Sequence, residues 1–158
     1  MHITALNNDL TDDVLKLMSL GEPYVKARTP SDYWLYAKLF SSTCPVALAD
    51  NSVVGALIAM RSQDDPTEIY IQDVMTHPGY RRRGVAAELI SVVRARAKQW
   101  GCRRIYLTSE PDNTAAYQTW RSLGFANSVG DYAIKGLQVV KDFKGPGKDR
   151  AVFELKVS

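Results

Sequence analysis

The segment that decides the fold reads Asp73-Val74-Met75-Thr76-His77-Pro78-Gly79-Tyr80-Arg81-Arg82-Arg83-Gly84-Val85-Ala86. It joins the end of a predicted strand to a short basic turn and to the beginning of a long helix. The first N–H groups of a helix have no partner inside the helix, and the helix dipole places partial positive charge there. Both effects favour a bound phosphate. The residues alone therefore predict an anion site at this turn.

The composition of the turn strengthens that prediction. Gly84 and the small Ala86 allow a pyrophosphate to approach the main chain closely, and Arg81, Arg82 and Arg83 add positive charge around it. The alternative interpretation is a tight strand-to-helix connection whose basic residues are only solvated. The sequence favours the phosphate site over this alternative.

Outward from the turn, apolar spacing and turn residues predict the remaining elements. A helical stripe of Val85, Leu89, Val92, Val93, Ala97 and Trp100 predicts a helix over residues 85–100. We expect seven strands, over residues 3–6, 45–49, 53–60, 68–76, 104–109, 137–143 and 151–157. We also expect three further helices. The first runs from an Asn8-Asp9 cap to about residue 20, the second covers residues 30–40, and the third runs from an Asp112-Asn113 cap to about residue 123. This order indicates one α+β (mixed α/β) domain over residues 1–158 with a single central sheet.

The helix predicted over residues 30–40 is unusually aromatic. It contains Tyr33, Trp34, Tyr36 and Phe40. Aromatic side chains serve equally well in a core and in the wall of a ligand pocket. The sequence leaves these two roles open.

The composition narrows the function classes. The chain has 158 residues, 46% of them hydrophobic and 23% charged, which is typical of one globular domain. A net charge of +3 suits anionic ligands but is too small to indicate nucleic-acid binding. Two histidines exclude a His-rich metal site, and we expect Cys44 and Cys102 to be reduced thiols. With no visible signal peptide and no long apolar run, we expect a cytoplasmic protein without a membrane partner.

Two motifs resemble those of the GNAT acetyltransferases. Residues 81–86 match the cofactor motif Arg/Gln-x-x-Gly-x-Gly/Ala, and Asn113-Thr114-Ala115-Ala116 followed by Gly124-Phe125 is similar to the second motif of that family. The resemblance implies a GNAT-like fold with a mostly antiparallel sheet of six to seven strands, splayed at the cofactor strand and flanked by about four helices. It also implies acetyl-CoA as co-substrate and no metal. The residues it assigns to the cofactor are Val74, Thr76, Arg81, Arg82, Arg83, Gly84, Val85, Ala86 and Asn113.

The same resemblance implies an N-acetyltransferase that moves the acetyl group by direct attack in a ternary complex, with the Val74 N–H as the donor to the acyl oxygen. Asp73 is the main candidate for a carboxylate facing the amine; its alternative role is a structural hydrogen bond, and Glu68 and Glu110 are weaker candidates. The family often places a tyrosine where this chain has Trp120. Indole is not a useful proton source, so either Tyr117, one helical turn earlier, is the general acid, or the thiolate leaves unassisted.

The acceptor is left open by the sequence. Residues 68–73 resemble polyamine-type members, and residues 33–36, 41–46 and 64–66 are similar to diaminobutyrate acetyltransferases, so we expect a small-molecule amine that is amino-acid-like, a diamine or an antibiotic. The alternatives are a protein or peptide N-acetyltransferase and a non-catalytic acyl-CoA-binding module. Among residues 141–150, a basic cluster is either a solvated turn or an anion contact. A homodimer is common in the family, and no nucleic-acid partner is expected.

Overall fold

One mixed sheet organises the molecule. The computed structural model describes residues 1–157 and contains a seven-stranded sheet in the order β1-β2-β3-β4-β5-β9-β6. All neighbouring strands are antiparallel except β4 and β5, which are parallel. The strands of this sheet are β1 (His2–Ala5), β2 (Pro45–Ala49), β3 (Ser52–Arg61), β4 (Glu68–Thr76), β5 (Arg104–Ser109), β6 (Ala126–Asn127) and β9 (Ala151–Lys156). The predicted α+β domain with a mostly antiparallel sheet is confirmed.

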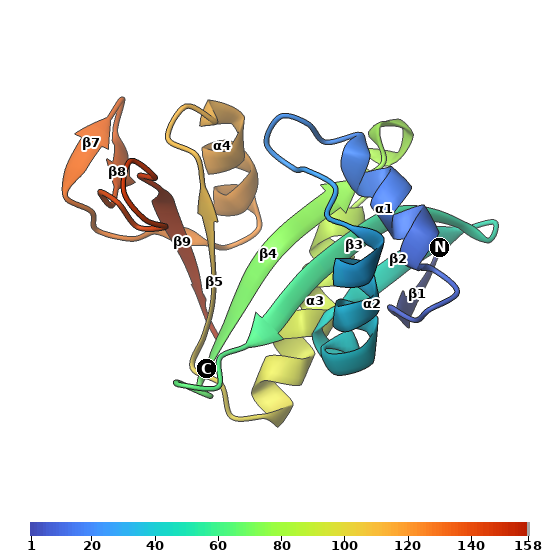
Figure 1. Cartoon of the computed structure of the whole chain (residues 1–158). Coiled ribbons are helices and arrows are strands. Elements are labelled where there is room, and N and C mark those ends of the chain that lie inside the picture. The colour runs from blue at the N-terminus through green and yellow to red at the C-terminus, as the bar shows by residue number, and fades with distance from the viewer. Residues whose placement is uncertain (158) are drawn as a thin grey trace.

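Four helices cover the two faces of the sheet (Figure 1). They are α1 (Thr11–Ser19), α2 (Pro30–Leu39), α3 (Val85–Gln99) and α4 (Thr114–Ser122). Helices α1 and α2 enclose one apolar cluster against the sheet. Helices α3 and α4 pack against a second cluster, which includes the side chains of β5 and β9. The sheet therefore has an apolar core on each face.

Helix α3 lies directly against β3 because its apolar stripe meets a residue without a side chain. Val85 and Leu89 are buried, and a Cβ built on Gly55 would lie 2.5 Å from Cγ1 of Val85. The predicted stripe is wrong at one position: Val92 is 36% exposed. Position 92 precedes the buried Val93 by one residue, or 100° around the helix, which places Val92 at the edge of the stripe.

A β-bulge in β4 changes which side chains face each core. Ile58 pairs with Asp73 and Ala59 pairs with Ile71, so Gln72 is the extra residue. Ile71 belongs to the cluster beneath α3, whereas Met75 belongs to the cluster beneath α1 and α2. Without the bulge, residues 71, 73 and 75 would share one face of the strand. The bulge thus turns Asp73 toward the N-terminal helices.

Two predicted boundaries are wrong. Helix α1 begins at Thr11, its N-cap is Leu10, and no side chain caps it. The Asn7 carboxamide instead accepts a hydrogen bond from the Asp9 N–H in the preceding turn, 2.9 Å away. Short polar side chains stabilise such turns as readily as they cap helices, so the first cap was placed too early.

The expected strand over residues 137–143 is also wrong. Only β8 (Leu137–Val139) is a strand, and it pairs with β7 (Tyr132–Ile134) in a separate two-stranded sheet. Residues 141–149 form a loop held by aspartates: the Asp142 N–H donates to Asp149, and the Gly147 N–H donates to Asp142. Strands β6 and β7, with two and three residues, were not predicted because they are too short to show a period.

Candidate active site

The sheet opens between its two parallel strands. Residues Glu68–Tyr70 of β4 pair with Arg104–Tyr106 of β5, and beyond that point the strands diverge (Figure 1). The His77 N–H donates to the Val54 carbonyl at 2.8 Å. Because antiparallel neighbours exchange hydrogen bonds at alternate residues, the main-chain groups of Val74 and Thr76 point away from β3. They face the opening, as the sequence analysis requires of residues that would hold an extended ligand.

The turn before α3 presents unpaired amides. Gly84 is the N-cap of α3 with φ of 78°, and no side chain caps the helix there. Among residues 1–157, none accepts a hydrogen bond from the N–H groups of residues 81–87. A Cβ on Gly84 would meet nothing within 4 Å. This is a bare anion cradle at a helix N-terminus, and it fits a diphosphate.

A cavity of about 700 Å³ runs from this turn into the opening. Arg81, Val74, Asp73 and Asn113 line it, so four of the predicted site residues share one space. The other predicted residues, Thr76, Arg82, Arg83, Gly84, Val85, Ala86 and Tyr117, are not in its wall. Of these, Arg83 lies over the Tyr80 ring at 5.0 Å, outside the cavity. The turn therefore stands at the mouth of the cavity rather than within it.

Asp73 is the buried charge of the cavity. Its side chain is 6% exposed, and Oδ2 lies 3.4 Å from Nε of Arg28. Burial raises the pKa of this carboxyl above its ordinary value, while the charges of Arg28 and Lys144 act in the opposite direction. A carboxylate with a raised pKa is a better proton acceptor than an ordinary one.

Arg28 is held in place by the start of α2. Thr29 and Asp32 form a capping box, and the Tyr33 hydroxyl accepts a hydrogen bond from the Arg28 N–H at 3.1 Å. Tyr33 and Tyr36 are buried in the core, whereas Trp34 is 51% exposed, and none of the three lines either cavity. The hydroxyls of the two tyrosines have a second role, because Tyr36 also accepts a hydrogen bond from the Gln72 amide at 2.8 Å. The α2 tyrosines thus position pocket residues without lining the pocket.

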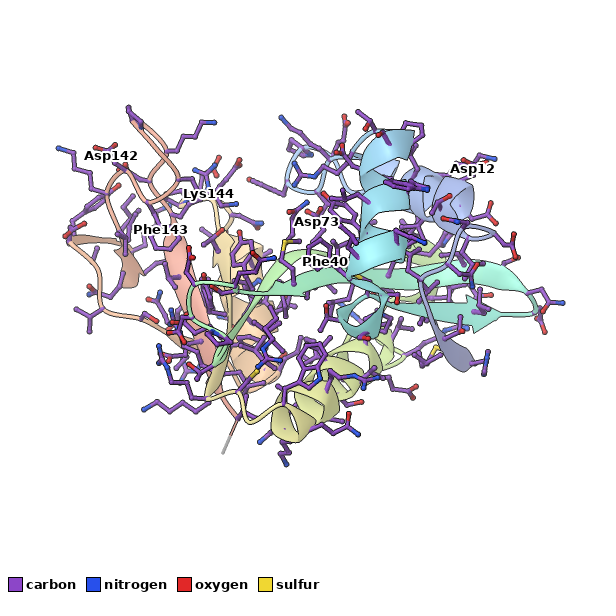
Figure 2. All side chains as sticks on the ribbon, turned by 60° about the horizontal axis from the view of Figure 1, so that its bottom comes forward. Asp12, Phe40, Asp73, Asp142, Phe143 and Lys144 are labelled. Carbon is purple, nitrogen blue, oxygen red and sulfur yellow. The ribbon has the colours of Figure 1, made fainter. Side chains whose placement is uncertain are left out.

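A smaller cavity of about 330 Å³ adjoins the opening on the side of the 141–149 loop. Its wall consists of Arg28, Tyr70, Gln72, Tyr106, Phe143 and Lys144. The two tyrosine rings lie 5.1 Å apart, and Nζ of Lys144 is 5.6 Å from the centre of the Tyr70 ring. Figure 2 shows Asp73 between the N-terminal helices and the segment that carries Phe143 and Lys144. A space of this volume is within the range of small-molecule pockets.

Helix α4 borders the cavity through its first turn and Trp120. The Asn113 side chain caps the helix by accepting from the Ala116 N–H at 3.3 Å. Trp120 lines the cavity, whereas Tyr117 packs on Phe153 with ring centroids 6.1 Å apart. The catalytic role of Tyr117 stays a prediction, and its hydroxyl is not part of the cavity wall.

Sequence reasoning missed Arg28 as a site residue and gave Lys144 only as one member of a basic cluster. Arg28 lies in a connection between two helices, and its only signal was the Thr29-to-Asp32 capping box that fixes the adjacent chain. Lys144 lies in a segment predicted as an ordinary turn. Both residues reach the site through tertiary packing, which no local pattern reports.

Within residues 1–157, no group of three or more His, Cys, Asp or Glu side chains is arranged to hold a metal ion. No helix in that part of the chain is both long enough and apolar enough to cross a membrane. Cys44 and Cys102 are free and buried.

The fold and the site define a class: an α+β protein with a splayed sheet and, at the opening, a helix N-terminus whose unpaired amides are free to hold an anion. The sequence profile of the Acetyltransferase (GNAT) family matches residues 12–125. The chain therefore belongs to the GNAT acetyltransferase family.

Individual relatives have low sequence identity to this chain. Aminoglycoside N(6')-acetyltransferase type 1 of Salmonella typhimurium is 28% identical over 86 residues, 51% of this chain and 59% of that relative, so the chain matches about three fifths of its length. A diaminobutyrate acetyltransferase of Paenibacillus lautus, solved with L-2,4-diaminobutyric acid and coenzyme A, superposes with a TM-score of 0.78 at 20% identity, covering 98% of this chain and 93% of that one. The ribosomal-protein-S18-alanine N-acetyltransferase of Escherichia coli superposes with a TM-score of 0.70 at 15% identity, covering 99% and 94%. These structures share the fold.

Proposed function

We propose that this protein transfers an acetyl group from acetyl-CoA to a primary amine of a small molecule. The observation that carries the proposal is the continuous cavity that leads from Arg81 at the anion cradle past Val74 to the buried Asp73. One end suits a diphosphate and the other suits an ammonium group, which are the two charges the reaction must bring together.

Different groups of the chain bind different parts of acetyl-CoA. Unpaired amides at the start of α3, with Arg81 beside them, bind the pyrophosphate of coenzyme A. The exposed main-chain edge at Val74 and Thr76 binds the extended arm along the opening, and the Val74 N–H is positioned to donate to the acyl oxygen. Asn113 holds the first turn of α4 against the same space. When bound, acetyl-CoA supplies the acetyl group as a thioester.

Asp73 receives the acceptor. Its raised pKa suits it to take a proton from the incoming ammonium group, directly or through a water molecule, or to anchor that group for attack. The cavity brings Asp73 and Val74 together, so the amine and the acyl oxygen donor meet at the β-bulge. Direct attack in a ternary complex needs no covalent intermediate on the protein, and neither cysteine lines the cavity.

The alternatives are a protein or peptide N-acetyltransferase and a non-catalytic acyl-CoA-binding module. A peptide groove must remain open along its length, and Phe143 and Lys144 line the acceptor side of this opening. The small-molecule proposal is supported by the similarity to an aminoglycoside acetyltransferase and a diaminobutyrate acetyltransferase, although a protein-acetylating enzyme also shares the fold. We also propose a cytoplasmic location, since two buried thiols in a free state suit a reducing compartment.

The test is release of the CoA thiol from acetyl-CoA against a panel of diamino acids, polyamines, aminoglycosides and N-terminal peptides. Turnover with a small amine supports the proposal. Turnover with peptides alone would replace it with the protein-acetylating alternative. Tight acetyl-CoA binding with no turnover on any acceptor would favour the alternative of a non-catalytic acyl-CoA-binding module.

A further inference from the structure

We infer that the acceptor amine carries a carboxylate, which Arg28 and Lys144 bind from the two sides of the opening. The inference rests on the proposed function and names the substrate class for that site. It would make the acceptor an amino acid with a free side-chain or α-amine, rather than a polyamine or another polycation.

The first observation is the spare hydrogen-bonding capacity of Arg28. Its contact with Asp73 uses Nε alone, at a distance of 3.4 Å. Among residues 1–157, the two Nη groups have no hydrogen-bond partner, and the side chain is 40% exposed toward the cavities that it lines. A guanidinium presents its donors as a planar fork that fits a carboxylate. Arg28 can therefore hold Asp73 and still bind a second anion.

The second observation is Lys144, an unpaired cation on the facing wall. It lines both cavities, and none of the ion pairs formed within the described residues includes it. Its ammonium group lies over the Tyr70 ring at 5.6 Å. The loop that carries it is held by Asp142 and Asp149, which fixes the main chain on both sides of Lys144, and the exposed side chain extends from that loop.

The third observation is the charge balance of the acceptor space. The wall of the smaller cavity contains Arg28 and Lys144 and no carboxylate. Apart from Arg81, which is assigned to the cofactor, the larger cavity adds Lys26, Lys148 and Arg150, against Asp73 and Glu110. A polycationic acceptor would meet one buried carboxylate and an excess of positive charge, which repels it. An amino acid instead places its ammonium at Asp73 and its carboxylate between the two cations.

The experiment compares acceptors that differ by the carboxylate alone. We would measure kcat/KM by thiol release for L-2,4-diaminobutyrate and 1,3-diaminopropane, for L-ornithine and putrescine, and for L-lysine and cadaverine, with kanamycin as a polycation. In at least one pair, the carboxylated member should be favoured by roughly tenfold or more, because a charge-assisted hydrogen bond to a partly buried cation is worth about that factor.

Lys144→Met is the diagnostic variant, since it keeps the apolar stem and removes the charge. It should raise KM for the preferred amino acid by roughly tenfold to hundredfold and leave the decarboxylated partner within about twofold. Lys141→Met is the matched control, because Lys141 belongs to the same segment but lines neither cavity. Calorimetric titration of the preferred amino acid into protein saturated with coenzyme A gives a readout independent of turnover, and binding should weaken in Lys144→Met only.

Three results would overturn the inference. If 1,3-diaminopropane, putrescine, cadaverine or kanamycin were preferred, the inferred carboxylate of the acceptor would be ruled out. The proposal that the protein is an acetyltransferase would still hold. Equal effects of Lys144→Met and Lys141→Met would show that Lys144 does not contact the acceptor. Absence of thiol release with every amine would remove the proposed function itself, and the inference with it.

Discussion

At the scale of single residues, Asp73 combines burial with charge in a way that structural residues rarely do. It lies at the β-bulge, next to one arginine, in a cavity that reaches the anion cradle. A carboxylate that served only the fold would be expected to accept hydrogen bonds from the main chain, and none of its contacts in the described residues is of that kind. Its contacts are with the side chains of Arg28 and Gln72, which is consistent with the role toward a ligand proposed above.

We expect Asp73→Asn to lower kcat by roughly a hundredfold while acetyl-CoA affinity changes little, because the change removes a proton acceptor and leaves the phosphate cradle intact. Steady-state kinetics with equilibrium binding of acetyl-CoA check this. Unchanged turnover would return Asp73 to a structural role.

The same residue makes a prediction about stability. The pKa of Asp73 is raised above 3.8 by burial, so the folded state holds the proton more tightly than the unfolded chain does. As pH rises from 3.8 through the folded-state pKa, the free energy of unfolding of the native protein should fall relative to that of Asp73→Asn. Urea unfolding of both proteins between pH 4 and 7.5 measures the difference.

Asp65 supplies a control with the opposite sign. Hydrogen bonds from Thr67 are the main cause that lowers the pKa of Asp65, to about 2. Its contribution is present above pH 3.8 and is lost as pH falls toward 2, so the native protein should gain stability relative to Asp65→Asn as pH rises over that range. If both variants shifted in the same direction with pH, the Asp73 assignment would be wrong.

The two thiols should be inert in the folded protein. Burial raises the pKa of Cys44 to about 12 and also raises the pKa of Cys102. The thiolate is the reactive species, so both should resist alkylation. Iodoacetamide at pH 8, read by mass spectrometry, should label neither cysteine in the native protein during a period that labels both in urea. Rapid native labelling of either would contradict this burial.

At the scale of elements, the proposed cofactor site depends on the start of α3. Gly84→Glu should abolish coenzyme A binding, because it places an anion where unpaired amides and the helix dipole favour a phosphate. Gly101→Glu is the matched control at the other end of the helix: it has φ of 71° and, like Gly84, no atom within 4 Å of an added Cβ. Both should lose stability through backbone strain, of about 1 kcal/mol, and Gly101→Glu should keep coenzyme A affinity in calorimetry. Equal binding by both variants would place the phosphate elsewhere.

The close contact between α3 and β3 leads to a separate prediction about stability. Gly55→Ala would put a methyl group 2.5 Å from Cγ1 of Val85 and 3.3 Å from Cδ1 of Leu89, so helix and strand must separate. Overpacking of this kind costs about 1–3 kcal/mol, and urea unfolding should show it. Gly136→Ala is the control: its φ of 83° brings strain without a neighbour, and its loss should be the smaller one. A loss for Gly55→Ala no larger than the control's would mean that α3 does not press on β3.

The accuracy of the predictions made from the sequence also differs between elements. Long segments with a clear period, such as β4 and α3, were predicted within a residue or so of their ends. The bulge at Gln72 was not derivable from the residue pattern, because it depends on pairing with β3 rather than on local preference. The turn predicted over residues 144–148 is present, but the strand predicted to continue to residue 143 is wrong, because the shape of the 141–149 loop depends on Asp142 and Asp149 meeting across it. The cradle was predictable because it is local, whereas Arg28 and Lys144 come to Asp73 from distant parts of the chain.

At the scale of the whole molecule, the apolar cluster beneath α3 continues from β3 and β4 into β5 and β9, whereas the strand pairing between β4 and β5 is short. Strand β5 reaches β4 only at Glu68–Tyr70, and the opening above that point separates α4 and the 141–149 loop from α1 and α2 (Figure 1). A ligand that spans the opening would contact both halves at once. Coenzyme A should therefore stabilise the whole fold rather than one helix.

Thermal unfolding gives the last prediction. At a coenzyme A concentration of about a hundred times Kd, binding to the folded state adds roughly 2.7 kcal/mol, which corresponds to a rise in Tm of about 5–10 °C for a domain of this size. Pantetheine lacks the pyrophosphate and should give a much smaller rise at the same concentration, because the cradle before α3 then has no anion to hold. In Gly84→Glu the two ligands should become equivalent. If coenzyme A and pantetheine raised the Tm of the native protein equally, the opening would bind the arm alone, and the helix N-terminus would have no part in recognition.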